Sequence, residues 1–242
     1  MCDIANDDLI KIEHFMEYND FRKFTYATTF DSAFKRAEIA LQNKDFEGAI
    51  LDFSQALEFE PNSIEANVHK ALCLIALKRY TSAIPIAEKL IKLDPDSSTH
   101  YATLATCYFE MQKYVEADNY FSKAIEIKPD DYPLYVYRGE SRFKAKNYSA
   151  AFFDFTKCIE MQPTILGAYD FRGRTRGVLK DYKGAIADFL HILNHKPDSG
   201  EILFQLGVSY LHDNQIELGE KALRKAEKLG LQKATDILNS KH

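Results

Sequence analysis

The sequence has few of the residues that interrupt regular structure, with only 10 glycines and 7 prolines in 242 residues. Collagen-like, linker-like and low-complexity chains need far more of both, so these classes are excluded. Hydrophobic residues make up 46% of the chain and charged residues 28%, which is typical of a globular protein. A chain of this length is able to bury a sizeable core.

Cysteine is also scarce, and the four residues Cys2, Cys73, Cys107 and Cys158 form no Cys-x-x-Cys pair. They predict neither a disulfide framework nor a zinc site, so we expect no metal and no cofactor. The N-terminus is acidic where a secretory signal is basic, and no run approaches the ~20 apolar residues that span a bilayer. We therefore expect a soluble, cytoplasmic protein with no membrane partner.

The chain lacks an excess of basic residues and the common catalytic motifs. Its 31 Lys and Arg against 36 Asp and Glu give a net charge of −5, so we expect no nucleic-acid partner. It contains no Gly-rich phosphate loop, no Gly-x-Ser-x-Gly and no His-Glu-x-x-His, so we expect no catalytic residues and no enzyme. His191 and His195 lie four residues apart, and we interpret them as exposed or capping side chains because no third metal ligand accompanies them.

A regular internal period is the dominant feature of the sequence. Five of the seven prolines repeat at one constant step: Pro61, Pro95, Pro129, Pro163 and Pro197. Two columns with the same step hold small residues: Ala37, Ala71, Ala105, Gly139, Gly173 and Gly207, and Ala49, Ala83, Ala117, Ala151, Ala185 and Gly219. Aromatic residues recur at Phe46, Tyr80, Tyr114, Tyr148 and Tyr182, and at Phe53, Phe121, Phe155 and Phe189. Columns that recur together indicate tandem copies of one structural unit.

Each unit is predicted to contain two helices. In the third unit, apolar residues recur at helical spacing over residues 98–111 and again over 115–127, with a short polar turn between them. A small residue in each helix allows the two backbones to approach closely. The second unit carries Pro85 early in its second helix, so we expect that helix to start late, near Ala83.

This pattern resembles the tetratricopeptide repeat, a helix–turn–helix unit of about 34 residues. The third unit carries the resemblance best, with Tyr101, Leu104, Ala105, Tyr108, Ala117, Phe121, Ala124 and Pro129 in the expected places. The resemblance implies an all-α, right-handed superhelical solenoid of about six repeats. The predicted repeats are residues 30–63, 64–97, 98–131, 132–165, 166–199 and 200–231.

Both ends are predicted to cap the solenoid, because terminal repeats otherwise expose apolar surface. Residues 1–29 form the N-terminal capping segment, with a helix expected over residues 7–17, although a flexible tail is the alternative. Residues 232–242 form the C-terminal capping helix, after Gly230 as the C-cap of the preceding one.

Two columns change in step along the chain. Arg accompanies a later Asp at the same spacing in three units, as Arg36 with Asp52, Arg138 with Asp154, and Arg172 with Asp188. The third and sixth units carry neither charge, and the second unit is the exception, with Lys70 and Ile86 at these positions. We therefore predict an Arg–Asp pair between the two helices of a unit. The alternative is a basic patch for an acidic peptide or a phosphate. For that patch Arg142 and Arg176 are the better candidates, since we identify no acidic partner for either.

The resemblance implies a concave groove that the first helices line and that binds a peptide or a helix of a partner protein. The predicted lining is His69, Leu72, Thr103, Thr106, Phe109, Tyr137, Glu140, Phe143, Phe171, Arg174 and Gln205. We predict a non-enzymatic scaffold or adaptor, either a monomer or a homodimer, whose partner the sequence does not name. The alternative is a structural protein that self-assembles through its terminal repeats or N-terminal segment.

One subclass of the family is disfavoured. Co-chaperones that grip the acidic C-terminus of heat-shock chaperones use a clamp of Lys, Asn and Arg side chains. The corresponding residues here are Phe34, Glu38, His69, Thr99 and Thr103, and none matches.

Overall fold

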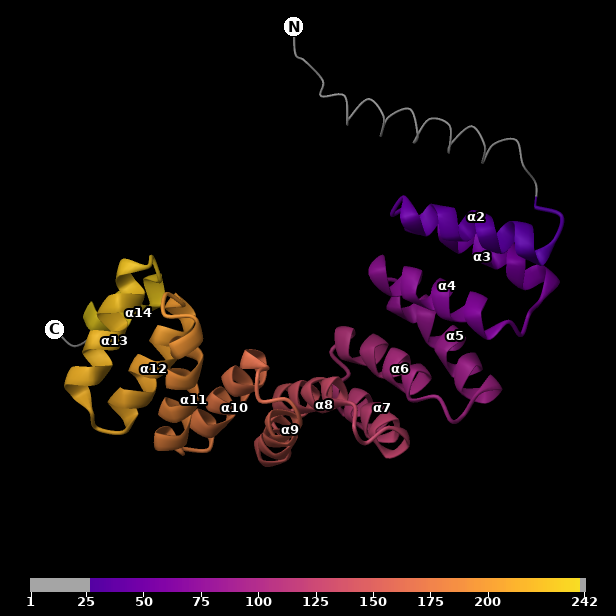
Figure 1. Cartoon of the computed structure of the whole chain (residues 1–242). Coiled ribbons are helices and arrows are strands. Elements are labelled where there is room, and N and C mark those ends of the chain that lie inside the picture. Colours follow the sequence, from indigo (N-terminus) through magenta and orange to yellow (C-terminus); the bar gives the residue numbers. More distant parts are fainter. Residues whose placement is uncertain (1–26, 240–242) are drawn as a thin grey trace, which may run out of the picture. The chain divides into compact units, whose positions relative to one another are not determined.

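A computed structural model describes residues 27–239, and the helix expected over residues 7–17 lies outside this range (Figure 1). Within the described range the chain forms 13 helices and no strand. The helices are α2 Phe30–Gln42, α3 Phe46–Phe59, α4 Ile64–Ala76, α5 Tyr80–Leu93, α6 Ser98–Glu110, α7 Tyr114–Ile127, α8 Tyr132–Lys144, α9 Tyr148–Met161, α10 Leu166–Val178, α11 Tyr182–His195, α12 Gly200–His212, α13 Ile216–Lys228 and α14 Gln232–Asn239.

The turn inside each helical hairpin is three residues long and has the same backbone conformation every time. Its second residue adopts a left-handed conformation, with φ between 58° and 64°. These residues are Lys44, Lys78, Gln112, Lys146, Lys180 and Asn214. None is a glycine, although glycine adopts this conformation most readily, so the packing of the two helices maintains the turn.

The expected late start of the second helix in the second unit is wrong. Helix α5 begins at Tyr80 and contains Pro85 in its interior. Proline inside a helix removes the hydrogen bond to the carbonyl four residues earlier, and its ring crowds that carbonyl. Pro85 nevertheless lies on the exposed side of the helix. Buried Ala83 and Ala87 flank it, and their packing holds the helix together.

The small residues lie where two helices of a hairpin touch. A Cβ atom at Gly139 would be 2.7 Å from the ring of Phe155, and one at Gly173 would be 2.8 Å from the ring of Phe189. Both distances are shorter than any normal contact, so a side chain at either position would overpack the seam between the helices. The pattern of small and aromatic columns is thus the packing pattern of the hairpin.

The chain divides into two compact units, one ending at Cys107 and the other beginning at Tyr108. In the first unit α2 packs against α3, α3 against α4 and α4 against α5. In the second, each helix from α7 to α14 packs against the next. Helix α10 also packs against α8 and α12, so the first helices of three successive hairpins are neighbours. Helix α14 lies where a final helix is expected, after Gly230 with φ of 85°.

In the first unit, His100 of α6 is buried, with 4% of its surface exposed. Its Nε2 atom is 3.6 Å from Oδ2 of Asp94, and neither ring nitrogen has a hydrogen-bond partner. Burial lowers the pKa of His100, and the nearby carboxylate of Asp94 opposes this effect. The folded state therefore favours the neutral imidazole.

This pKa shift predicts a loss of stability in mild acid. The unfolded chain takes up a proton at His100 near pH 6.5, whereas the folded chain resists it, so the free energy of unfolding falls as pH drops below about 6.5. The equivalent residues of the next and the last repeats are Leu134 and Ile202. We expect His100→Leu to reduce this pH dependence in urea titrations between about pH 5 and 7.5. An unchanged pH dependence would contradict the assignment.

Candidate functional site

The first helices of the second unit carry most of the predicted groove residues. We call the surface of α8, α10 and α12 that bears Tyr137, Glu140, Phe143, Phe171, Arg174 and Gln205 the first-helix face. The ring of Tyr137 stacks on Phe121 at 5.8 Å between centroids, yet the residue stays 49% exposed. Phe171 stacks on Phe155 at 5.2 Å and is half-buried. These aromatic residues therefore both join successive repeats and present apolar surface.

The other predicted groove residues lie elsewhere. His69, Leu72, Thr103 and Thr106 belong to the first unit. His69 packs between Phe34 and Phe53, with centroid distances of 6.0 and 5.4 Å, while Leu72 is 49% exposed. The hydroxyls of Thr103 and Thr106 donate to carbonyls of their own helix. In the second unit, Phe109 packs edge-on against Tyr114.

A hollow of about 380 Å³ opens on the first-helix face, beside α10. This α10 hollow brings together three predicted residues, Phe143, Arg174 and Gln205. Its other lining residues are Gly173, Gly177, Val178, Tyr182, Phe189, Val208, Ser209 and His212. Its volume is within the range of small ligand pockets, and its lining combines apolar walls with a few polar groups.

The sequence analysis missed Gly177, although a signal for it exists. The same column holds Leu41, Ile75, Phe109, Phe143 and Leu211, all large and apolar. Gly177 breaks this column, and a Cβ atom built there meets no atom within 4 Å. The missing side chain leaves open space beside Tyr182, whose ring stacks instead on His212 at 5.0 Å.

The charged groups of the first-helix face are largely neutralised by one another. Arg174 Nε donates to Oδ1 of Asp170 at 2.7 Å, and its Nη2 is 3.9 Å from Oε1 of Glu201. Gln205 Nε2 donates to the same carboxylate oxygen at 3.2 Å. Burial raises the pKa of Glu140, and Lys144 opposes this effect. The face therefore combines apolar side chains with an arginine whose charge is paired.

The structure places the three Arg–Asp pairs in direct contact. Arg36 Nε donates to Asp52 at 2.8 Å, Arg138 Nη2 to Asp154 at 2.6 Å and Arg172 Nη2 to Asp188 at 2.6 Å. All three carboxylates are buried. Burial raises the pKa of Asp154, while hydrogen bonds from Arg138 and Arg142 lower it and so offset the cost of burying the charge.

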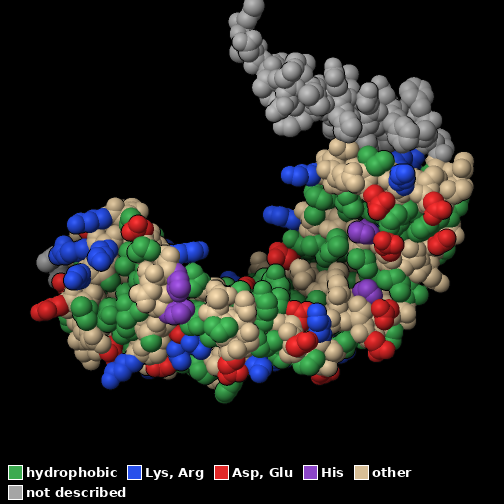
Figure 2. All heavy atoms as spheres, viewed as in Figure 1, with side chains coloured by type: hydrophobic (Ala, Val, Ile, Leu, Met, Phe, Trp, Pro, Cys, Tyr) green, Lys and Arg blue, Asp and Glu red, His purple; other side chains and the backbone are tan. Residues whose placement is uncertain are grey.

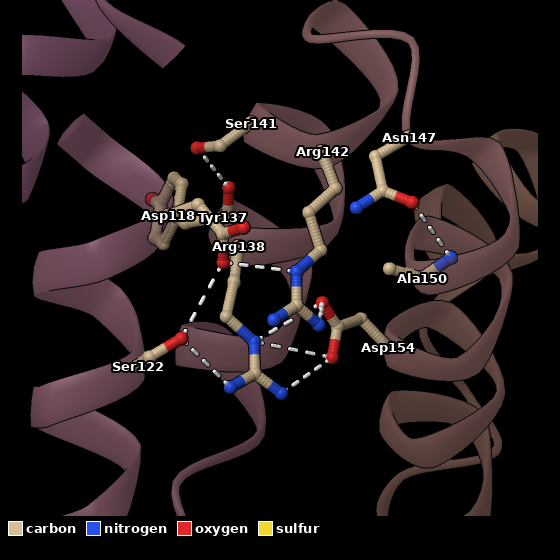
Figure 3. A network of polar contacts seen from close by, with 9 residues as sticks. All are labelled: Asp118, Ser122, Tyr137, Arg138, Ser141, Arg142, Asn147, Ala150 and Asp154. Carbon is tan, nitrogen blue, oxygen red and sulfur yellow. Dashed lines mark hydrogen bonds and ion pairs between the residues drawn. The ribbon is translucent and has the colours of Figure 1, made fainter. Parts of the chain in front are cut away.

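The interpretation of Arg142 and Arg176 as residues without an acidic partner is wrong, as Figure 3 shows for Arg142. Arg142 donates from Nε to Asp118 at 2.9 Å and from Nη1 to Asp154 at 2.8 Å, so its guanidinium links α7, α8 and α9. Arg176 Nη1 donates to Asp188 at 2.8 Å, and its Nε is 3.3 Å from Asp181. One aspartate thus serves two arginines in each of these two hairpins, and both arginines are part of the packing.

Comparison with known proteins gives the family. A family model described as the tetratricopeptide repeat matches residues 40–107 and 74–137. Residues 40–137 of the chain are thus tetratricopeptide repeats. No curated protein sequence matches it. The fold is an all-α repeat solenoid, and proteins of this family are in general non-enzymatic scaffolds for protein–protein interaction.

Several solved structures resemble this chain in fold. YrrB, described as having an unusual peptide-binding site, is 19% identical, with a TM-score of 0.70 over 77% of this chain and 97% of its own. MamA from Desulfovibrio magneticus RS-1 is 17% identical, with a TM-score of 0.67 over 72% of this chain and 100% of its own. A tetratricopeptide repeat protein from Parabacteroides merdae is 16% identical, with a TM-score of 0.64 over 96% and 93%.

Three cysteine thiols within residues 27–239 are buried and free. Burial raises the pKa of the Cys73, Cys107 and Cys158 thiols to about 11, so they are protonated and poorly nucleophilic at neutral pH. His191 stacks on Tyr169 at 4.1 Å, next to His195. No group of three potential metal ligands occurs in this range.

The described surface mixes charges of both signs. Figure 2 shows Lys and Arg side chains gathered over α13, where Lys221, Arg224, Lys225 and Lys228 are exposed. Elsewhere in this view, acidic and basic side chains are interspersed with exposed apolar ones. None of the helices between residues 27 and 239 combines the length and the apolar character that crossing a bilayer requires.

Proposed function

We propose that this protein is a non-enzymatic adaptor that binds an extended segment or a helix of a partner protein along the first-helix face of its second unit. The observation that carries the proposal is the α10 hollow, which lies on a face where Tyr137 is half-exposed and Phe143 and Phe171 are half-buried. Apolar pockets give affinity to a bound segment, and a few charges set its register. We therefore limit the proposed binding groove to the first-helix face of the second unit.

The protein is also proposed to work in the cytoplasm and without a cofactor. Cys73, Cys107 and Cys158 are free thiols, which persist best in a reducing compartment. Their burial gives them a structural role as small apolar side chains. The acidic net charge of −5 speaks against nucleic acid as the partner.

Affinity capture with paired variants tests the proposal. Tyr137→Ala with Arg174→Ala removes an exposed ring and a charge from the first-helix face. Phe153→Ala with Lys157→Ala makes the same kind of change on α9, where the two side chains are 68% and 50% exposed. We expect the first pair to lose the partner proteins that the wild-type chain retains, and the second pair to keep them. Retention by the first pair, with an unchanged circular dichroism spectrum, would refute the proposed surface.

A further inference from the structure

Two packing patterns repeat through the second unit, and both lose an aromatic ring at the α10 hollow. The first joins the end of a first helix to the start of the second helix in the same hairpin. Phe109 meets Tyr114 edge-on at 5.6 Å between centroids, and Phe143 meets Tyr148 in the same way at 5.3 Å. In the next hairpin the tyrosine is present as Tyr182, but Gly177 stands at the position of the phenylalanine, and the Tyr182 ring stacks on His212.

The second pattern joins one hairpin to the next. Tyr137 stacks on Phe121 with an interplanar angle of 12°, and Phe171 stacks on Phe155 at 13°. In the next repeat Phe189 takes the position of Phe155, but Gln205 takes the position of Phe171, so the second ring is missing. The side chain of Gln205 is flexible, and a single hydrogen bond to Glu201 is its only described polar contact.

Gly177 and Gln205 both line the α10 hollow, so the places of the two missing rings border the same open space. The hollow is lined by the equivalents of the residues that such rings contact in the preceding repeats, Tyr182 and Phe189, and also by Phe143. Gly177 leaves its part of the wall without a side chain, whereas the Phe189 ring covers Gly173 one helical turn earlier. A planar aromatic group that enters the hollow takes the place of the ring that Gln205 replaces, and Tyr182 lines the same hollow.

We propose that the α10 hollow receives an aromatic side chain, Phe, Tyr or Trp, of the bound partner segment. This inference rests on the proposed function and names the residue type that the partner must supply. The ring enters beside Tyr182, displaces the Gln205 side chain and packs on Phe189, as Phe171 packs on Phe155. Aromatic pairs prefer such offset-stacked and edge-to-face arrangements, which contribute beyond the area they bury.

The absence of tryptophan from the chain gives a direct test. N-acetyltryptophanamide is titrated with the full-length protein while indole fluorescence is excited selectively, so that the signal comes from the probe alone. We expect a blue shift that saturates with protein concentration, because the indole moves from water to an apolar site. N-acetyltyrosinamide should reverse the shift by competition, and N-acetylalaninamide should not. No saturable shift with probe and protein at millimolar concentrations would overturn the proposal.

Filling the hollow from within supplies matched controls. Gly177→Phe restores the ring of the first pattern, Gln205→Phe restores that of the second, and each should abolish the shift. Gly167→Phe adds the same side chain to the same helix, at a glycine that also has open space around it but does not line the hollow. It should leave the shift unchanged. If both filling variants still shifted the fluorescence of the probe, the probe would bind elsewhere and the inference would be wrong. The proposed function is tested separately, by partner capture with the Tyr137→Ala and Arg174→Ala pair.

Discussion

Replacement of Asp154 with alanine should lower the free energy of unfolding by about 3 kcal/mol. The carboxylate of Asp154 is buried and accepts hydrogen bonds from both Arg138 and Arg142. Its removal leaves two guanidinium groups largely shielded from water, with side-chain exposures of 15% and 19%, and without their shared partner. Urea unfolding followed by circular dichroism measures the loss.

The last repeat provides the control for this prediction. At the positions of Arg138, Arg142 and Asp154 it has Leu206, Tyr210 and Ala222, so the fold accommodates an uncharged set. The triple variant Arg138→Leu, Arg142→Tyr and Asp154→Ala should recover most of the stability that Asp154→Ala loses, because a buried ion cluster is replaceable by apolar residues. If the triple variant were as unstable as Asp154→Ala, unpaired charge would not be the cause of the lost stability.

Replacement of Phe155 with alanine should cost about 3 to 5 kcal/mol. Phe155 is fully buried, its ring fills the space over Gly139, and Phe171 stacks on it. The substitution leaves a cavity between two hairpins and removes the support of Phe171. The loss should appear as a lower denaturation midpoint in urea.

Phe153 is the matched control for Phe155. It lies two residues earlier on the same helix and is 68% exposed. Phe153→Ala should change the free energy of unfolding by no more than about 0.5 kcal/mol, as is usual for surface substitutions. Equal effects of the two substitutions would contradict the packing described for this seam.

The Arg–Asp pairs could be predicted because two columns of the sequence change together at one fixed spacing. The role of the second arginine beside each shared aspartate, Arg142 or Arg176, could not be predicted in this way. Arg142 shares Asp154 with Arg138 and also uses Asp118 of the preceding hairpin, so its partners come from two different columns. A carboxylate has two oxygens and serves two guanidiniums, which a one-to-one count of charges does not show.

The helical hairpins follow from their periodic residues, whereas the α10 hollow does not. The repeat pattern identifies residues that are present, and the hollow arises because rings are absent at Gly177 and Gln205. The start of α5 was missed for a different reason: tertiary packing of Ala83 and Ala87 outweighs the local preference of Pro85. The left-handed turn residues, such as Lys44 and Gln112, carry no compositional signal of their conformation.

Site-specific photo-crosslinking tests the central claim, that partners bind the first-helix face, most directly. A photoreactive p-benzoylphenylalanine takes the place of Tyr137 on that face in one protein and of Phe153 on α9 in another, both of which are well exposed aromatic positions. We expect a discrete crosslinked partner from position 137 and none from position 153. The same partner crosslinked only from position 153, or equally from both, would contradict the account.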